Sequence, residues 1–568
     1  MLAGTYIAGL IFFINPHLPF ASGPVFSGVL FYASLLAPCS LTLLLAVTRF
    51  KKQSIQQWFP VALTVVMLSG ALMFWTHAYY FGFYLPPGIN KRLLKAAVFL
   101  SLSTIIGFYT LLIHRIKRRR YGKRAMSIFG LLALSSIYVV MERREAYQPA
   151  IEPKPRPTTF RSSQRPFLCV IGIDTASFDV ILPLAEQGQL PFFRQALEEG
   201  AYARLPPLEP VKPAPLWTTL VTGKYPYKHG IVGAKKHAPY FLDPELGSSY
   251  LNLLPLAVGF ESWGIWGHDT TVNQNDMRVL PLWEILSRLQ MSTALIGWPM
   301  TEPANPDVHL TLTDTFFNSG AMDSQLAYPK EMAERARLFR TGLDKLNSES
   351  LSRFGPKPPN IVLESLAKDQ WRKDLAFFVI DQNPVDAVFL HLPGLRDISE
   401  HYFGGYSAVQ FKGNQNEESV EASRLLSAYY AEIDDFLAKF EAAIHRPKLM
   451  VLVSVHGVGR TTGLSEAQRW LNRQPATRGD LDDGADGILV FLGEGIQKAD
   501  NIRTANLVDL PPTLLYGLGF PVARDLDGSV LIEIFSPSSM ARQPLTFVPS
   551  YEAFSASPQI IFPEEIQE

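Results

Sequence analysis

A short apolar run, Phe167–Ile173, ends abruptly at Asp174 and limits the fold more than any other stretch of this chain. Its apolar and β-branched residues, bounded by Pro166 and a Gly-containing end, predict a buried strand of a parallel sheet. Open α/β sheets place their sites just beyond the carboxyl ends of such strands. Asp174 is therefore a candidate site residue, although a helix N-cap or a turn aspartate would have the same local sequence.

Further apolar runs follow and alternate with helix-like stretches. Ala387–Leu392 and Leu449–Val453 predict two more buried strands, and Ser419–Ile444 predicts a long helix. One helix, with Leu184, Leu190, Phe193 and Leu197 as its apolar positions, is expected to end at a cap on Gly200. Strands that alternate with helices indicate an α/β fold with a mostly parallel sheet. Residues 235–384 have an irregular pattern and are a candidate cap insertion.

Potential metal ligands follow three of the predicted strands. They are Asp174, the pair Asp397 and His401, and His456. The Asp-x-x-x-His spacing puts a carboxylate and an imidazole one turn apart on the same face of a helix. Mixed aspartate and histidine ligands suit zinc or another divalent metal. A solvated helix start for Asp397 and His401, or a buried structural histidine for His456, would explain each fragment alone.

Most of the apolar excess of the 568-residue chain lies before residue 142. Hydrophobic residues make up 47% of the sequence and the mean hydropathy is +0.09, which is high for a wholly soluble protein. A bilayer span needs about 20 apolar residues. Residues 1–141 thus predict a transmembrane region of about five helices, Leu2–Phe20, Val25–Val47, Phe59–Tyr84, Leu93–Ile113 and Met126–Met141. The first could be a signal peptide, but a retained span is favoured because it lacks a basic start and a cleavage site.

Positive charge predicts the orientation of these spans. The loop between the fourth and fifth segments holds Arg115, Lys117, Arg118, Arg119, Arg120, Lys123 and Arg124. Because basic loops face the cytoplasm, residues 166–568 are expected to form an extracytoplasmic domain on an inner, cytoplasmic membrane. Residues 142–165 are rich in Pro and Arg and predict an extended linker. The spans show no repeated interruptions of the kind found in transporters.

The overall composition excludes some classes of partner and site. The 52 basic and 52 acidic residues balance, so no global charge favours nucleic acid. The two cysteines, Cys39 and Cys169, lie in apolar segments. They indicate neither a disulfide framework nor a thiolate metal site.

Three longer motifs carry a family resemblance. They are WTTLVTGKYPYKHGI from Trp217, GWPMTEPAN from Gly297 and LPPTLLYGLGFPVARDLDGSVL from Leu510. They resemble the type I phosphodiesterase/nucleotide pyrophosphatase branch of the alkaline phosphatase superfamily, over about residues 166–535. The resemblance implies an alkaline-phosphatase-like fold, in which helices sandwich a mostly parallel sheet, here preceded by an α-helical transmembrane bundle.

The resemblance also implies two zinc ions held at seven positions, one of them a Ser or Thr nucleophile. The metal ligands carried over are Asp174, Asp397, His401 and His456, and Asp483 lies near the position of the last histidine. The nucleophile position is Pro213, and Val455 replaces the Asp of the family's Ser-Asp-His-Gly motif. Proline has no hydroxyl to form a covalent intermediate, and valine cannot bind a metal. The acidic stretch around Asp483 could equally be an exposed loop.

Two functions remain open. In the favoured one, the two-metal site is degenerate and the protein binds or scaffolds at the outer face of the membrane without catalysis. In the other, it is an active metal-dependent phosphodiesterase or phosphotransferase on an envelope lipid or nucleotide-like substrate. The expected cofactor is zinc or another divalent metal, as one ion or none. The expected partners are the lipid bilayer, other membrane-protein subunits and a phosphate-containing ligand, but no nucleic acid.

Overall fold

The computed structural model describes most of the chain outside the first fifty residues. The described residues are 23, 26–31, 33–34, 55–141, 165–239, 267–319, 325–339, 346, 348–382, 385–413, 416–459, 475, 477–481, 484–499, 502 and 505–552. The chain divides into two compact units. One comprises residues 1–149 and 226–272, and the other residues 150–225 and 273–568.

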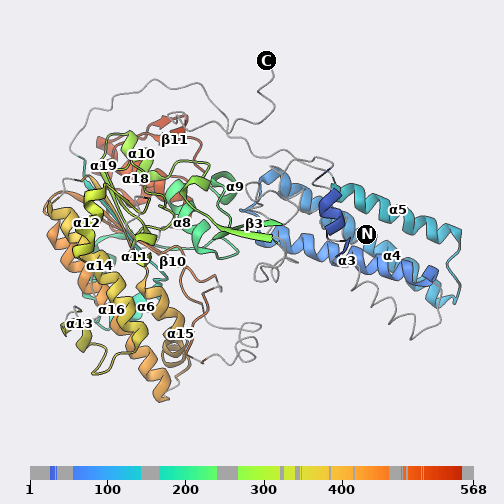
Figure 1. Ribbon diagram of the computed structural model, residues 1–568, viewed down its shortest axis with the longest axis horizontal. Coiled ribbons are helices and arrows are strands. Elements are labelled where there is room, and N and C mark those ends of the chain that lie inside the picture. The colour runs from blue at the N-terminus through green and yellow to red at the C-terminus, as the bar shows by residue number, and fades with distance from the viewer. Residues whose placement is uncertain are drawn as a thin grey trace. The chain divides into compact units, whose positions relative to one another are not determined.

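Long helices dominate the first unit. They are α3 (Ile55–Tyr80), α4 (Pro87–Ile116) and α5 (Lys123–Met141), seen in blue and cyan in Figure 1. Among the described residues, Phe59–Thr76 and Asn90–Ile116 are long and apolar enough to cross a membrane. The first predicted span lies outside the described residues and the second is described only in part. The prediction of about five spans therefore stays a prediction.

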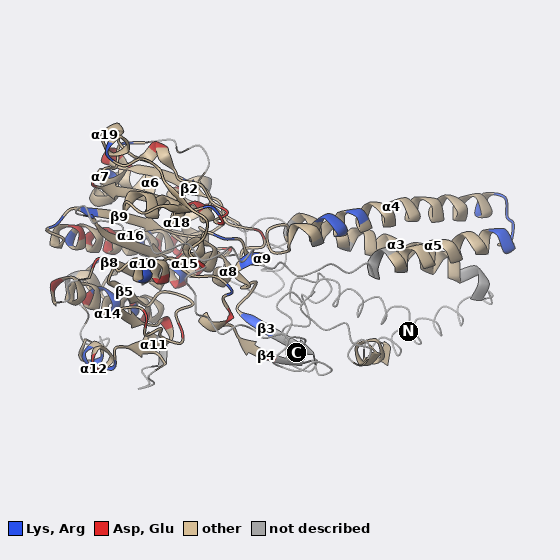
Figure 2. Cartoon of the chain, turned by 90° about the horizontal axis from the view of Figure 1, so that it is seen from above, with Lys and Arg blue, Asp and Glu red and all other residues tan. Residues whose placement is uncertain are grey.

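The connection from α4 to α5 carries the basic residues that the sequence places in one loop. All of these residues are exposed, and Figure 2 shows the Lys and Arg residues in blue at one end of the two helices. The ring of Tyr121 stacks on that of His114 at 4.9 Å, which closes the turn. The unit is completed by α9 (Pro226–His229) and an antiparallel pair of strands, β3 (Lys235–Pro239) and β4 (Gly267–Thr271).

An eight-stranded sheet forms the centre of the second unit, in the order β2-β10-β9-β1-β8-β5-β6-β7. Strands β9, β1, β8, β5 and β6 are parallel, and β10, β2 and β7 each run antiparallel to a neighbour. The strands are β1 (Phe167–Ile173), β2 (Ala201–Leu205), β5 (Thr293–Ile296), β6 (Leu310–Leu312), β7 (Ala327–Tyr328), β8 (Ala387–Leu392), β9 (Lys448–Val453) and β10 (Gly487–Gly493). The mostly parallel sheet expected from the sequence is confirmed.

Helices cover both faces of this sheet (Figure 1). Phe167, Cys169, Ile171 and Ile173 of β1 point into one apolar core, while Leu168 and Val170 point into the other. Burial on both faces explains why the strand is apolar throughout. The first core is covered by α6 (Phe178–Glu186), α7 (Pro191–Glu199), α14 (Asn360–Gln382), α15 (Gly394–Lys412) and α16 (Glu417–Ala443), and the second by α8 (Pro213–Thr222), α10 (Leu282–Arg288) and α18 (Leu510–Gly517).

Shorter elements complete the second unit. They are η3 (Gln274–Asp276), α11 (Asp314–Ser319), α12 (Lys330–Leu338), α13 (Ser348–Ser352), η5 (Leu507–Asp509), β11 (Val522–Ala523), η6 (Ile532–Ile534), α19 (Pro537–Arg542) and β12 (Phe547–Val548). Strands β5, β6 and β7 and helix α14 come from the stretch 235–384, the candidate cap insertion. That part of the stretch belongs to the main sheet and its helical cover.

A helix does end at Gly200 as predicted, since Gly200 is the C-cap residue of α7, but the stretch expected to form one helix forms two. Helix α6 ends before Gly188, which has a left-handed φ of +75°, and Pro191 begins α7. Gly200 is not a left-handed cap, since its φ is −97°. It is needed because a Cβ at this position would lie 2.4 Å from the carbonyl oxygen of Phe491 on β10.

Candidate functional site

The carboxyl ends of β1 and β9 bring two of the predicted ligands together. Asp174 follows β1, and His456 follows the adjacent parallel strand β9. The Oδ1 atom of Asp174 lies 3.8 Å from Nε2 of His456, and both side chains are almost completely buried. The distance is too long for a hydrogen bond.

A third side chain in this cluster, His391, was not predicted from the sequence. It lies in β8, on the other side of β1, and its Nε2 is 4.0 Å from Oδ2 of Asp174. Gly172 of β1 pairs with His391 and leaves room for it and for the ring of Trp217. The sequence did contain a signal for His391, because it is a polar residue near the end of the apolar run Ala387–Leu392.

Both histidines direct their Nε2 atom at Asp174. Nδ1 of His456 lies 2.9 Å from the carbonyl oxygen of Gly457, so Nδ1 carries a proton and donates it to that oxygen. His391 forms a hydrogen bond with the backbone of Gly297. The N–H group of Gly297 already donates to the carbonyl of Leu312, and Nε2 of His391 has no partner among the described residues, so Nδ1 of His391 donates to the carbonyl of Gly297. Burial lowers the pKa of His391 to about 4, against the smaller opposing effect of Asp174, and keeps the ring neutral at neutral pH.

Arg396, on α15, stands at the solvent side of the cluster. Its Nη1 lies 3.9 Å from Oδ2 of Asp174, and its side chain is 34% exposed while that of Asp174 is 6% exposed. The guanidinium therefore offsets part of the carboxylate charge without a hydrogen bond to it.

Asp397 and His401 lie one turn apart on α15, as their spacing predicts, but they face other partners. Oδ2 of Asp397 is 3.3 Å from Nζ of Lys368 on α14. His401 is exposed, and its Nδ1 lies 2.8 Å from the carbonyl oxygen of Asp397. Within the described residues, no hydrogen bond or ion pair joins either side chain to Asp174 or His456. The structure therefore brings Asp174 and His456 together and gives Asp397 and His401 other contacts.

The structure also describes Pro213 and Val455, the two positions at which the sequence departs from the family motif. Pro213 is the first residue of α8, after an extended Lys212. Val455 is fully buried in the apolar core beside α8. Asp483 lies outside the described residues. In the part of the chain that the structure describes, no group of three or more His, Cys, Asp or Glu side chains could hold a metal ion.

The hydroxyl groups near these positions are engaged in internal hydrogen bonds. Thr218 donates from Oγ1 to the carbonyl of Ala214 in its own helix at 2.8 Å. Thr175, next to Asp174, donates to Oγ of Ser399, and Ser454 donates to the carbonyl of His456. All three hydroxyls thus donate to acceptors within the chain.

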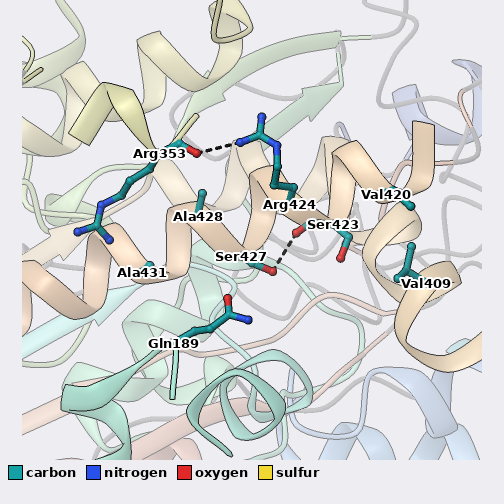
Figure 3. A pocket seen from close by; sticks show the side chains of 9 residues that line it. All are labelled: Gln189, Arg353, Val409, Val420, Ser423, Arg424, Ser427, Ala428 and Ala431. Carbon is teal, nitrogen blue, oxygen red and sulfur yellow. Dashed lines mark hydrogen bonds between the residues drawn. The ribbon is translucent and has the colours of Figure 1, made fainter. Parts of the chain in front are cut away.

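A separate hollow of about 500 Å³ lies along α16 (Figure 3). Arg424 donates to the carbonyl of Arg353 at 2.9 Å and pairs with Glu421, and Arg353 pairs with Asp435. The predicted ligands are not among its lining residues, which are Gln189, Arg353, Val409, Val420, Ser423, Arg424, Ser427, Ala428 and Ala431.

Comparisons with known proteins match the second unit. The sequence model of a family described as type I phosphodiesterase / nucleotide pyrophosphatase matches residues 168–507, more than half of the chain. No curated protein sequence matches the chain.

Solved structures with a similar arrangement include three enzymes. Phosphonoacetate hydrolase from Sinorhizobium meliloti 1021 is 13% identical, with 55% of this chain and 63% of that chain covered and a TM-score of 0.32. Wild-type alkaline phosphatase PafA is 12% identical over 66% of this chain and 100% of that chain, with a TM-score of 0.41. Phosphonate monoester hydrolase SpPMH from Silicibacter pomeroyi is 13% identical over 66% and 78%, with a TM-score of 0.36. The match thus spans less than two thirds of the phosphonoacetate hydrolase.

Proposed function

Because this chain belongs to the type I phosphodiesterase/nucleotide pyrophosphatase family, a hydrolase family with an alkaline-phosphatase-like fold, we propose that it is a member with a degenerate two-metal centre. Its role is non-catalytic binding or scaffolding at the outer face of a membrane. Phosphoryl transfer by two metals needs both ions about 3.5–4 Å apart, each with its own ligands. The chain supplies only part of that set.

The incomplete ligand sets carry the proposal, because no group of three or more His, Cys, Asp or Glu side chains among the described residues could hold a metal ion. Asp397 faces the ammonium of Lys368, which repels a divalent ion bound to the same carboxylate. The side chain of His401 is exposed to solvent. Asp174 and His456 remain together, but the family's second metal position keeps no assembled ligand set among the described residues.

The nucleophile position supports the same conclusion. A covalent phospho-enzyme needs an activated oxygen or nitrogen atom, and Pro213 offers none. Thr218 is fully buried and donates its hydroxyl to its own helix, so it cannot approach a substrate without breaking that bond.

The membrane role rests on the first unit. Helices α3 and α4 contain the two apolar stretches long enough to span a bilayer, and the exposed basic turn after α4 favours a cytoplasmic position for that end. We propose a multi-pass protein of the inner membrane with its second unit outside. Its partners would be the bilayer, other membrane subunits and a phosphate-containing ligand.

The test is a phosphodiesterase assay on the full chain in lipid nanodiscs. With bis(p-nitrophenyl) phosphate and added Zn²⁺, Mg²⁺ or Mn²⁺, we expect no turnover above that of empty nanodiscs. The variants Asp397→Ala and His401→Ala should behave like the wild type. Metal-dependent turnover that is lost in both variants would establish the active phosphodiesterase or phosphotransferase instead.

A further inference from the structure

Charge is distributed unevenly along the sequence. None of the 52 acidic residues lies before Glu142, whereas 13 of the 52 basic residues do. Seven of these 13 lie in the basic turn, residues 115–124, between α4 and α5. No acidic side chain within residues 1–141 can neutralise the remaining basic residues, so their positions need an explanation of their own.

Three of the remaining basic residues lie at the opposite end of α4 from the basic turn. They are Lys91, Arg92 and Lys95, called here the α4 basic group, and Figure 2 shows blue residues near both ends of this helix. The uncharged stretch between Lys95 and Arg115 has 19 residues, which is about 28 Å of helix. The hydrocarbon core of a bilayer is about 30 Å thick. A membrane that holds the basic turn at one surface thus has the α4 basic group at the other, where the preference of basic loops for the cytoplasm does not explain it.

The two lysines of this group continue an exposed apolar stripe of α4. Spacings of three and four residues put Lys91, Lys95, Val98, Leu102 and Ile105 on one face of the helix. Both lysines are exposed, and the three apolar side chains are between 47% and 63% exposed. On a helix long and apolar enough to span a bilayer, such a stripe contacts acyl chains. Cations followed by an apolar stripe match a phospholipid, whose phosphate group lies above its acyl chains.

Exposed aromatic side chains mark the same end of the helix pair as a membrane surface. The indole Nε1 of Trp75 on α3 donates to Oγ of Ser101 on α4 at 3.2 Å, which fixes the relative heights of the two helices. Tyr79 lies one turn beyond Trp75 toward the connection between them, on the side of Ser101 where Lys95 lies. Trp75 and Tyr79 are 45% and 80% exposed. Because Trp and Tyr concentrate at the headgroup level, the α4 basic group lies in a headgroup layer.

We propose that the α4 basic group binds the phosphate group of an anionic phospholipid whose acyl chain lies along the exposed stripe. Ammonium and guanidinium groups are the side chains that bind phosphate in proteins. The lipid belongs to the leaflet opposite the basic turn, which is the outer leaflet in the proposed topology. This inference rests on the membrane placement in the proposed function, and it deepens that function because it identifies the phosphate-containing ligand as an anionic lipid.

The experiment measures lipid preference next to Trp75 in the full chain. The protein is placed in phosphatidylcholine nanodiscs that contain increasing fractions of phosphatidylglycerol or phosphatidylcholine with brominated acyl chains, which quench nearby tryptophans. The Trp75→Phe protein gives the background from the other tryptophans. We expect phosphatidylglycerol to bind next to Trp75 at least about fivefold more tightly than phosphatidylcholine, since each basic residue near a membrane surface adds to the attraction for anionic lipids.

Matched variants locate the preference. Lys91→Gln/Lys95→Gln should bind the two lipids about equally, whereas Lys91→Arg/Lys95→Arg, which keeps both charges, should retain the preference. The control Lys117→Gln/Lys123→Gln removes the same number of charges from the basic turn and should also retain it. Both lysines of the α4 basic group are exposed, so their replacement leaves the packing of the helices unchanged.

Each outcome decides the proposal. Equal quenching by the two lipids in the wild type overturns it, and so does a preference that survives in Lys91→Gln/Lys95→Gln. Competition by millimolar glycerol 3-phosphate would assign the basic group to a soluble phosphate compound and would overturn the lipid site.

The failure of this inference can be told apart from the failure of the proposed function. Extraction of the chain from its native membrane by alkaline carbonate would refute the membrane placement. A chain that stays in the membrane but shows equal quenching would refute only the lipid site. The phosphodiesterase assay bears only on the non-catalytic role.

Discussion

Gly172 shows how one residue makes room for the cluster around Asp174. A Cβ at this position would lie 2.9 Å from the ring of Trp217 and 3.2 Å from Cδ2 of His391. Gly172→Ala should therefore displace one of these rings and lower the free energy of unfolding by about 1–3 kcal/mol. Thermal unfolding followed by tryptophan fluorescence measures it. Gly130→Ala, where nothing lies within 4 Å, is the control, and equal stability of both variants would contradict the packing argument.

Val455 is the residue at which the family motif and this structure differ most. Its side chain is fully buried among apolar residues, so Val455→Asp would bury a carboxylate without a partner. We expect a loss of at least about 3 kcal/mol in denaturant unfolding, more than for Val455→Ala, and no gain of phosphodiesterase activity. A stable, active Val455→Asp protein would mean that the position still faces the metal site.

At the scale of elements, Asp434 joins α16 to the start of α7. Its Oδ2 and Oδ1 accept hydrogen bonds from the backbone N–H groups of Phe192 and Phe193, at 3.0 and 2.8 Å. Leu190 offers no side-chain cap, so a residue from another helix satisfies these N–H groups. Burial raises the pKa of Asp434 to about 6, against the lowering effect of these bonds.

This shift gives a prediction about pH. The folded state holds the Asp434 proton more tightly than the unfolded state, whose pKa is near 3.8. The contribution of Asp434 to the unfolding free energy is therefore fully present at low pH and is lost as the pH rises from 3.8 to about 6. Asp434→Asn cannot titrate and should flatten that fall in the unfolding free energy. Asp435→Asn is the control. Asp435 forms the neighbouring ion pair with Arg353, and this variant should show the same fall in unfolding free energy as the wild type.

The elements were easier to predict than the contacts between them. Apolar runs with clear ends gave the bounds of β1 and β8, because strands buried on both faces have no polar positions to confuse the pattern. The break at Gly188 was missed because the apolar spacing continues through it. His391 was missed because its meeting with Asp174 depends on strand order, which one sequence does not encode locally. The spacing of Asp397 and His401 predicted their helix but not the competing contact with Lys368.

For the whole molecule, the balance of charge hides an uneven distribution. The 52 basic and 52 acidic residues cancel overall, yet the turn between α4 and α5 is exposed and strongly basic (Figure 2). In the proposed topology, anionic lipids and the membrane potential would hold this turn on the cytoplasmic side. Whether the second unit lies on the opposite side depends on how many spans separate the two, so orientation is a test of the whole proposal.

Cysteine labelling can make that test because the chain offers a nearly cysteine-free background. Its two cysteines are Cys39 and Cys169, and burial raises the pKa of Cys169 to about 12, so its thiol is unreactive. In a Cys39→Ser background, we expect a membrane-impermeant maleimide to label Glu494→Cys, exposed on the second unit, in intact cells. Gly122→Cys, in the basic turn, should be labelled only after the cells are opened, since the two positions are proposed to lie on opposite sides of the bilayer. Labelling of both in intact cells, or of neither, would place them on the same side. The number of membrane crossings between the turn and the second unit would then be even. This result would refute the proposed topology and the scaffold role at the outer face.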